Sequence, residues 1–119
     1  MKLYIGVLLA VAAVAGSLFA TVGSASTKAK IVTVTMTDFH FKIVPTKGLK
    51  HGVPITFKIA NKGAALHDFD LQKVKASKVI AAGKTTSITV TFKKAGTYKY
   101  ICDVPGHAAL GMAGSLKIS

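Results

Sequence analysis

From residue 30 to the C-terminus, apolar and polar side chains alternate with a period of two in one short segment after another. This is the spacing of a β-strand that buries one face. No segment after residue 27 shows a helical stripe, although 73–82 could hold a helical turn. The alternation predicts an all-β domain of seven or eight short strands, which in about 90 residues most naturally forms a two-sheet Greek-key sandwich. The expected strands are 30–36, 39–43, 53–60, 69–71, 79–80, 88–92, 98–102 and 114–118.

The N-terminal segment 1–26 differs from the rest of the chain. Between Leu3 and Ser26 it has no charged residue, and it ends in small residues that suit a signal peptidase. The run is longer than the apolar core of a secretory signal, about 7–15 residues, and approaches the roughly 20 residues of a membrane helix. We expect a hydrophobic leader helix, either a signal peptide cleaved near Ala25 or a retained N-terminal membrane anchor. Both alternatives place domain 27–119 outside the cytoplasm, whether periplasmic, secreted or anchored on the outer face.

The charge of the chain is strongly one-sided. It has 16 lysines, no arginine, no glutamate and four aspartates, which gives a formal charge of +12. Such a surface favours redox partners with an acidic docking surface, or an anionic membrane surface. A lysine-coated soluble face without a dedicated partner is the alternative. Nucleic acid is not expected, because base-reading arginines are absent and the lysines are dispersed. We expect a monomer.

The chain has a single cysteine, Cys102, so it can form no intrachain disulfide. Small exported domains often depend on disulfides for stability, and a bound metal would provide an alternative. An unpaired thiol outside the cytoplasm is otherwise open to oxidation. The lone cysteine therefore favours a metal ligand.

Cys102 opens a Cys-x4-His-x4-Met motif that continues with His107 and Met112. Cys102 ends one expected strand and Met112 precedes the next, so antiparallel pairing of the two strands would bring these residues together. Gly106 and Gly111 allow the loop to change direction before His107 and before Met112. The fourth candidate ligand is His67, at the start of a short apolar segment far upstream.

One thiolate, two imidazoles and one thioether form a soft, mixed donor set that suits copper. A structural zinc site more often has four Cys or His ligands in paired short spacings. Methionine as the fourth candidate favours one type 1 copper ion. Each residue alone has an ordinary interpretation, as core filling or as a solvated side chain, and only the combination indicates a metal site. His40 and His51 are interpreted as structural or solvated.

The chain resembles the cupredoxins, the small blue-copper family. The resemblance covers residues 30–119, and the four-residue gaps on both sides of His107 are similar to the rusticyanin and sulfocyanin branch. It implies a Greek-key sandwich, one type 1 copper and electron transfer between redox partners. Many members have Asn or Ser after the first histidine, where it braces the cysteine loop, whereas this chain has Asp68. An ionised Asp68 should stabilise Cu(II), so the resemblance does not imply a very high potential. The matching segments are 39–45, 61–69, 96–102, 105–107 and 111–112.

The expected function is that of a blue-copper protein shuttling single electrons between extracytoplasmic partners. The alternative is extracytoplasmic copper binding or delivery, although only Met36 and Met112 lie beyond residue 26 to hold Cu(I). We expect no enzymatic activity. A hydrolytic metal site needs an open position and a nearby base, and the only acids next to the expected ligands are Asp68 and Asp103.

Overall fold

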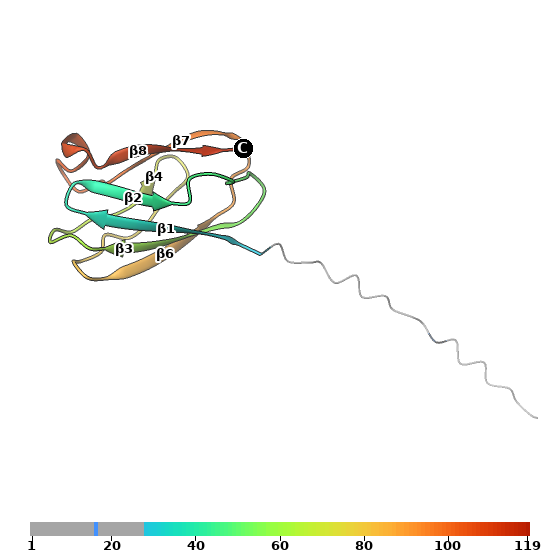
Figure 1. Ribbon diagram of the computed structural model, residues 1–119, viewed down its shortest axis with the longest axis horizontal. Helices are drawn as coiled ribbons and strands as arrows, with labels where there is room; N and C mark the ends of the chain where they lie inside the picture. Colours follow the sequence, from blue (N-terminus) through green and yellow to red (C-terminus); the bar gives the residue numbers. More distant parts are fainter. Residues whose placement is uncertain (1–15, 17–27) are drawn as a thin grey trace, which may run out of the picture.

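The computed structural model describes Gly16 and residues 28–119, which form a sandwich of two four-stranded sheets (Figure 1). The sheets have the strand orders β2-β1-β3-β6 and β5-β4-β7-β8. The predicted all-β sandwich of two sheets and eight strands is confirmed for the described residues. The strands are β1 (Lys30–Thr37), β2 (His40–Val44), β3 (Ile55–Asn61), β4 (Asp70–Leu71), β5 (Lys75–Ala76), β6 (Thr85–Val90), β7 (Gly96–Ile101) and β8 (Ala113–Ile118).

The first sheet is built around a parallel pair. β1 runs parallel to β3 with Lys30 opposite Ile55 and Met36 opposite Asn61, while β2 and β6 pair antiparallel at the two outer edges. Alternate residues of β1 and β3 face the core, as period-two alternation predicts. Because the pair is parallel, both strands end at the same pole of the sandwich.

The second sheet brings the two ends of the Cys-x4-His-x4-Met segment together. β7 and β8 are antiparallel, and Ile101 pairs with Ala113. One residue further, the Cys102 amide donates to the Met112 carbonyl over 3.0 Å. The antiparallel pairing expected from the motif is therefore observed, and the eleven-residue segment from Cys102 to Met112 folds into a loop at the end of the sandwich.

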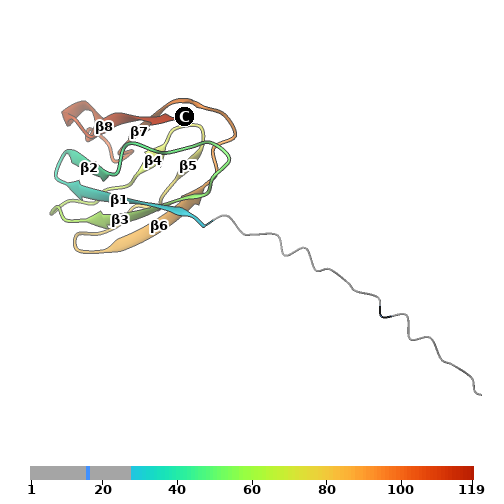
Figure 2. The same cartoon turned by 45° about the vertical axis from the view of Figure 1, so that its right-hand side comes forward.

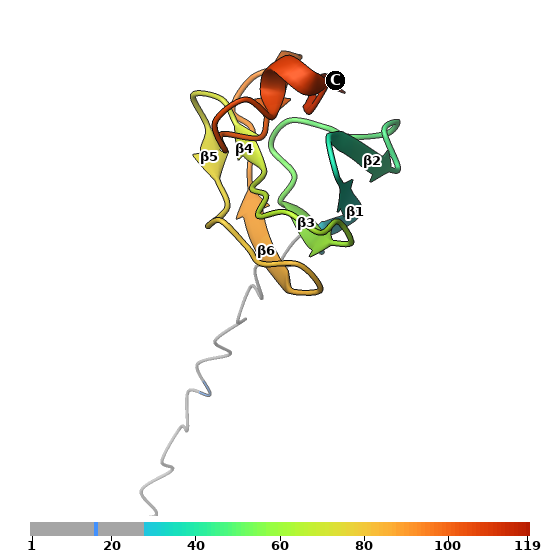
Figure 3. The same ribbon diagram turned by 90° about the vertical axis from the view of Figure 1, so that its left-hand side faces the viewer.

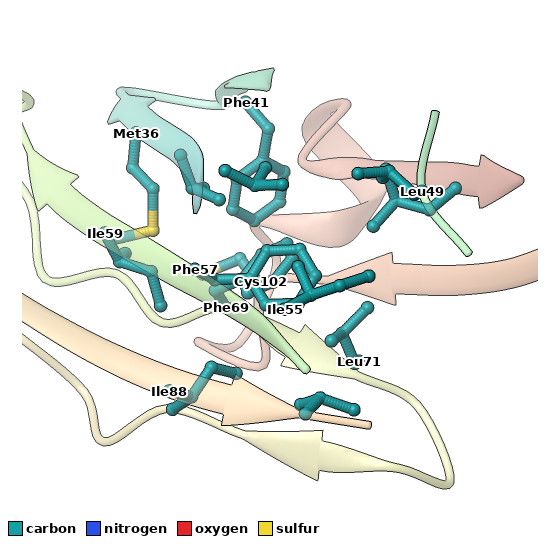
Figure 4. Close-up of a cluster of buried hydrophobic side chains, with 14 of the residues drawn as sticks. Met36, Phe41, Leu49, Ile55, Phe57, Ile59, Phe69, Leu71, Ile88 and Cys102 are labelled. Atoms are coloured by element: carbon teal, nitrogen blue, oxygen red, sulfur yellow. The ribbon is translucent and has the colours of Figure 1, made fainter. Parts of the chain in front are cut away.

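The hydrophobic core fills the space between the two sheets (Figure 4). Phe57 of β3 and Phe69, just before β4, are fully buried, with ring centroids 5.5 Å apart. Phe69 also lies 5.7 Å from Phe41 and 5.4 Å from Tyr100, so it joins both sheets. Cys102 is part of the same buried cluster. The thiol is thus held by core packing, while its loop continues toward the surface.

Three local expectations are corrected or extended. Phe39, expected to begin a strand, lies in the turn between β1 and β2 with a φ of 67°. Segment 73–82 holds the short edge strand β5 and a bridge at Ile80 rather than a helical turn (Figure 2). The loop after β7 contains a short 3₁₀ helix, η1 (Ala108–Leu110), which the alternation pattern did not predict.

The expected leader helix and the 1–26 boundary lie outside the described residues, apart from Gly16. Within the part of the chain that is described, no helix has the length and apolar character needed to cross a membrane.

Candidate metal centre

One pole of the sandwich carries the β1–β2 turn, the end of β3 and the loop between β7 and β8 (Figure 3). Asn61 organises the approach to this pole. Its buried amide donates to the carbonyls of Ala65 and Ile80 over 2.8 and 2.9 Å and accepts from the Gly63 amide over 2.9 Å. His67 follows and pairs with Ile80 as an isolated bridge. These contacts make a compact turn that buries the His67 side chain completely.

The loop from Cys102 to Met112 is shaped by its glycines and by η1. Gly106 and Gly111 have φ values of 82° and 114°, conformations that L side chains rarely adopt. The His107 amide donates to Val104, and the His107 carbonyl accepts from Met112 over 3.1 Å. The expectation that both glycines redirect the backbone is confirmed, and the loop is preformed by its own hydrogen bonds.

His67, Cys102 and His107 converge on one point. The two Nδ1 atoms are 3.1 Å apart, and the Cys102 Sγ lies 3.8 Å from His67 Nδ1 and 3.6 Å from His107 Nδ1. A point equidistant from three atoms at these separations is about 2.0 Å from each, close to ordinary metal–imidazole and metal–thiolate bond lengths. The trio therefore fits a single ion in a trigonal N₂S arrangement, the geometry of a blue-copper site.

The fourth predicted residue, Met112, is fully buried, and its backbone is hydrogen-bonded to two residues of this trio. Its amide and carbonyl bond to His107 and Cys102 respectively. His40 is exposed on β2, while the His51 Nδ1 lies 2.8 Å from the carbonyl oxygen of Ser119. Neither belongs to the cluster, in agreement with their interpretation as structural or solvated residues.

Burial raises the pKa of the Cys102 thiol, although the backbone amides of Asp68 and Val104 act in the opposite direction. The thiolate is the form that binds metals. A cation at the centre of the triangle would therefore displace the thiol proton and compensate the buried negative charge. The chemistry of the donors and their spacing both fit a soft, thiophilic ion.

The family model of the cupredoxin-like domain matches residues 7–112. The chain belongs to the cupredoxin-like family. Among curated relatives, the copper-resistant cuproprotein CopI of Rubrivivax gelatinosus is 28% identical over 116 residues, covering 81% of this chain and 70% of CopI. Rusticyanin of Acidithiobacillus ferrooxidans is 35% identical over 99 residues, covering 66% of this chain and 63% of the rusticyanin, just under two thirds of its length.

The fold of this cupredoxin is also that of auracyanin from Roseiflexus castenholzii. The reduced auracyanin structure superposes with a TM-score of 0.64 and 20% identity, over 77% of this chain and 98% of the auracyanin. At this identity the similarity establishes the fold alone. Support for a function therefore has to come from the chemistry of the three donor atoms of His67, Cys102 and His107.

The sequence interpretation missed Asp38, which lies in the β1–β2 turn against His67. The His67 Nε2 is 2.9 Å from Asp38 Oδ1, and the amides of Ala64 and Ala65 donate to the same oxygen over 3.1 Å. The Ala65 amide, then His67 and the Ala64 amide, lower the pKa of the carboxyl. Asp38 is 29 residues from His67, so only the position of an acid in an expected turn could have drawn attention to it.

Asp68 braces the cysteine loop. Its Oδ1 accepts the backbone N–H of Asp103 over 2.6 Å. A carboxylate can accept this hydrogen bond as an Asn or Ser oxygen would, so the departure noted in the sequence preserves the bracing contact. Burial raises the pKa of Asp68, although the hydrogen bond from the Asp103 amide acts in the opposite direction.

Asp70 provides a test of the electrostatics beside the site. Burial, followed by the nearby carboxyls of Asp103 and Asp68, raises its pKa to about 6. Because the folded state holds the proton more tightly than the unfolded chain, this group makes the free energy of unfolding decrease as pH rises from about 4 to about 6.

We expect Asp70→Asn to raise the free energy of unfolding at pH 7, by on the order of 1 kcal/mol once solvent screening is included. Urea unfolding of both proteins at pH 4 and pH 7 measures the difference. The gain should be largely absent at pH 4, where the wild-type carboxyl is protonated. An equal gain at both pH values would contradict an electrostatic cause.

Proposed function

We propose that this cupredoxin is a single-electron carrier that uses one type 1 copper ion held by His67, Cys102, His107 and Met112. The observation that carries the proposal is the triangle of two imidazole nitrogens and the cysteine sulfur, with donor separations of 3.1, 3.6 and 3.8 Å. Copper bound there would alternate between Cu(I) and Cu(II), accepting and releasing one electron. The carrier proposal includes no enzymatic step.

The surroundings of the three donors suit a carrier. His67 and Cys102 are held by the core and by backbone bonds, and the loop of His107 is closed by its own hydrogen bonds. A donor set that resists movement limits the rearrangement between the two oxidation states. His107 is half-buried, and Leu66 and Leu110 are exposed apolar residues at the same pole. We propose the His107 edge as the route for the electron.

The decisive experiment is a titration of the purified protein with Cu(II), recorded by visible absorption and by electrochemistry. We expect one equivalent of copper to produce an intense blue absorption together with a reversible one-electron couple. A colourless protein that holds one zinc ion tightly and shows no redox couple would contradict the proposal.

Met112→Leu tests the proposed axial ligand. Because the axial thioether donates weakly and tunes the potential, its loss should leave copper bound and raise the reduction potential. The blue absorption should persist, since it depends on the thiolate. Electrochemistry of the copper-loaded variant measures the change, with Met36→Leu as the control for loss of a buried thioether elsewhere in the core. An unchanged potential would remove Met112 from the axial role.

Copper handling is the second candidate function, and one observation favours it: a relative matched over 81% of this chain is named a copper-resistant cuproprotein. A delivery protein must exchange its metal, whereas a carrier must retain it through many redox cycles. Transfer of copper to a chelator within minutes, together with an irreversible couple, would favour handling. Slow exchange and a reversible couple would favour the carrier.

We propose an extracytoplasmic location, with segment 1–26 acting as a signal peptide or anchor. The supporting observations are the uncharged, mainly apolar run of residues 3–26 and the unpaired Cys102, which a metal would protect. We further propose that the lysine-rich surface attracts redox partners with an acidic docking face, or anionic membrane. The rate of electron exchange with an acidic partner should then decrease as ionic strength increases.

A further inference from the structure

His67 is held from both sides of its ring. Nδ1 faces the cysteine sulfur and the other imidazole, whereas Nε2 faces Asp38 Oδ1 at 2.9 Å. The His67 ring is completely buried, whereas the Asp38 side chain at the other end of the Nε2 contact is 38% exposed. Asp38 comes from the β1–β2 turn, which is separated from His67 in sequence by all of β3. The contact is therefore a tertiary one between two elements of the metal-binding pole.

The hydrogen-bond pattern around Asp38 determines which nitrogen of His67 carries the proton. Asp38 Oδ1 also accepts from the amides of Ala64 and Ala65, so it occupies a position surrounded by donors. An ionised carboxylate can only accept. His67 must therefore donate from Nε2, which leaves the lone pair of Nδ1 directed at the centre of the donor triangle.

Two further features of the turn support this arrangement. Gly63 packs so closely that a Cβ on it would lie 2.9 Å from the Asp38 backbone nitrogen and 3.0 Å from His67 Nε2. Phe39, the next residue of the turn, has a φ of 67° that is rare for a bulky side chain, and its ring meets that of His107 edge-on at 5.1 Å. The same two-residue turn thus contacts both imidazoles.

We propose that Asp38 is a positioning residue of the metal centre: its carboxylate fixes the tautomer and orientation of His67 and lowers the reduction potential of the bound copper. A carboxylate behind an imidazole ligand makes the ring a stronger donor and places negative charge near the ion. Both effects favour Cu(II). The inference deepens the carrier function and rests on it for the redox readout, but the tautomer can be measured without metal.

Asp38→Asn is the sharpest test, because it removes the charge and keeps a side-chain oxygen. The amides of Ala64 and Ala65 select that oxygen, so the His67 proton should stay on Nε2. We expect this variant to retain copper with a raised reduction potential. Asp38→Ala removes the acceptor as well, and we expect its copper affinity to fall by about 10–100-fold, the usual effect of losing such a partner.

Three readouts separate positioning from a general structural role. Nitrogen-15 NMR of the imidazoles in the metal-free protein reports the His67 tautomer, competition with a chelator reports copper affinity, and electrochemistry reports the potential. The matched control is Asp70→Asn at pH 8, where the wild-type carboxyl is ionised, because it also removes one negative charge near the site without a hydrogen bond to a proposed ligand. Its effect on the potential should be clearly smaller than that of Asp38→Asn.

The inference would be overturned by a wild-type His67 that carries its proton on Nδ1, or by a potential in Asp38→Asn that moves no more than in the control. If Asp38→Ala does not fold, the reduction potential of copper-loaded Asp38→Asn still tests the proposal. Should the wild-type protein bind no copper, the carrier function fails, while loss of the Nε2–H tautomer in Asp38→Ala would still support positioning. Retention of that tautomer in folded Asp38→Ala would refute it.

Discussion

Cys102→Ser is expected to abolish the intense visible absorption of the copper-loaded protein. The absorption of a blue-copper site arises from the covalent bond between Cu(II) and the thiolate, and a serine oxygen cannot replace that sulfur. The change is nearly isosteric, and the Cys102 backbone bond to Met112 does not depend on the side chain, so the domain should still fold. Visible spectroscopy during a copper titration, with circular dichroism as the check on folding, measures the result.

His40→Ala is the matched control for this experiment. His40 is an exposed histidine on β2 that lies outside the donor triangle, so its removal should change neither the absorption nor the copper stoichiometry. Persistence of the blue colour in Cys102→Ser would show that the thiolate is not the source. Loss of the colour in His40→Ala would indicate that the metal is held elsewhere.

Phe69→Ala is expected to cause the largest loss of stability. The ring is fully buried and packs against Phe41, Phe57 and Tyr100, so truncation removes apolar contacts with both sheets and leaves a cavity. Such a change typically lowers the free energy of unfolding by about 3–5 kcal/mol. This is a large part of the roughly 5–15 kcal/mol that stabilises a native domain. Urea unfolding of the metal-free and copper-loaded proteins measures it.

Because Phe69 follows His67 by two residues, the same cavity should also loosen the first histidine and weaken copper binding. Val44→Ala on the edge strand β2 is the control, since Val44 is 53% exposed and its truncation should change stability by less than about 0.5 kcal/mol. A loss in Phe69→Ala no greater than in Val44→Ala would show that the core tolerates the cavity by collapsing around it.

The strands were predictable because one face of each is buried. The alternation in 30–36 and 53–60 requires Val32, Val34, Phe57 and Ile59 to face one side, and the structure places all four in the core. Local periodicity says nothing about strand order, however. The parallel pairing of β1 with β3, which brings the Asp38 turn and the end of β3 to one pole, depends on how the two sheets close around the core.

Segments with little alternation were predicted less well. Segment 73–82 has no sustained alternation, and both residues of β5 are exposed, so this short strand depends on its two backbone pairs with β4. Phe39 was assigned to a strand because an apolar residue there fits the alternation, but the tight β1–β2 turn requires a positive φ at that position. In both places tertiary context outweighed the local pattern.

By itself, the sequence determined the fold class and the chemical nature of the donors. The residue types alone show that a strand-rich chain contains a lone cysteine, two candidate histidines and a methionine, the donors that suit copper. Only the tertiary structure decided that three of these donors meet within 4.8 Å, and that Asp38 rather than solvent holds the outer nitrogen of His67. The reason is that side-chain chemistry is local, whereas the distance between residues 29 or 35 positions apart is set by the packing of the whole sandwich.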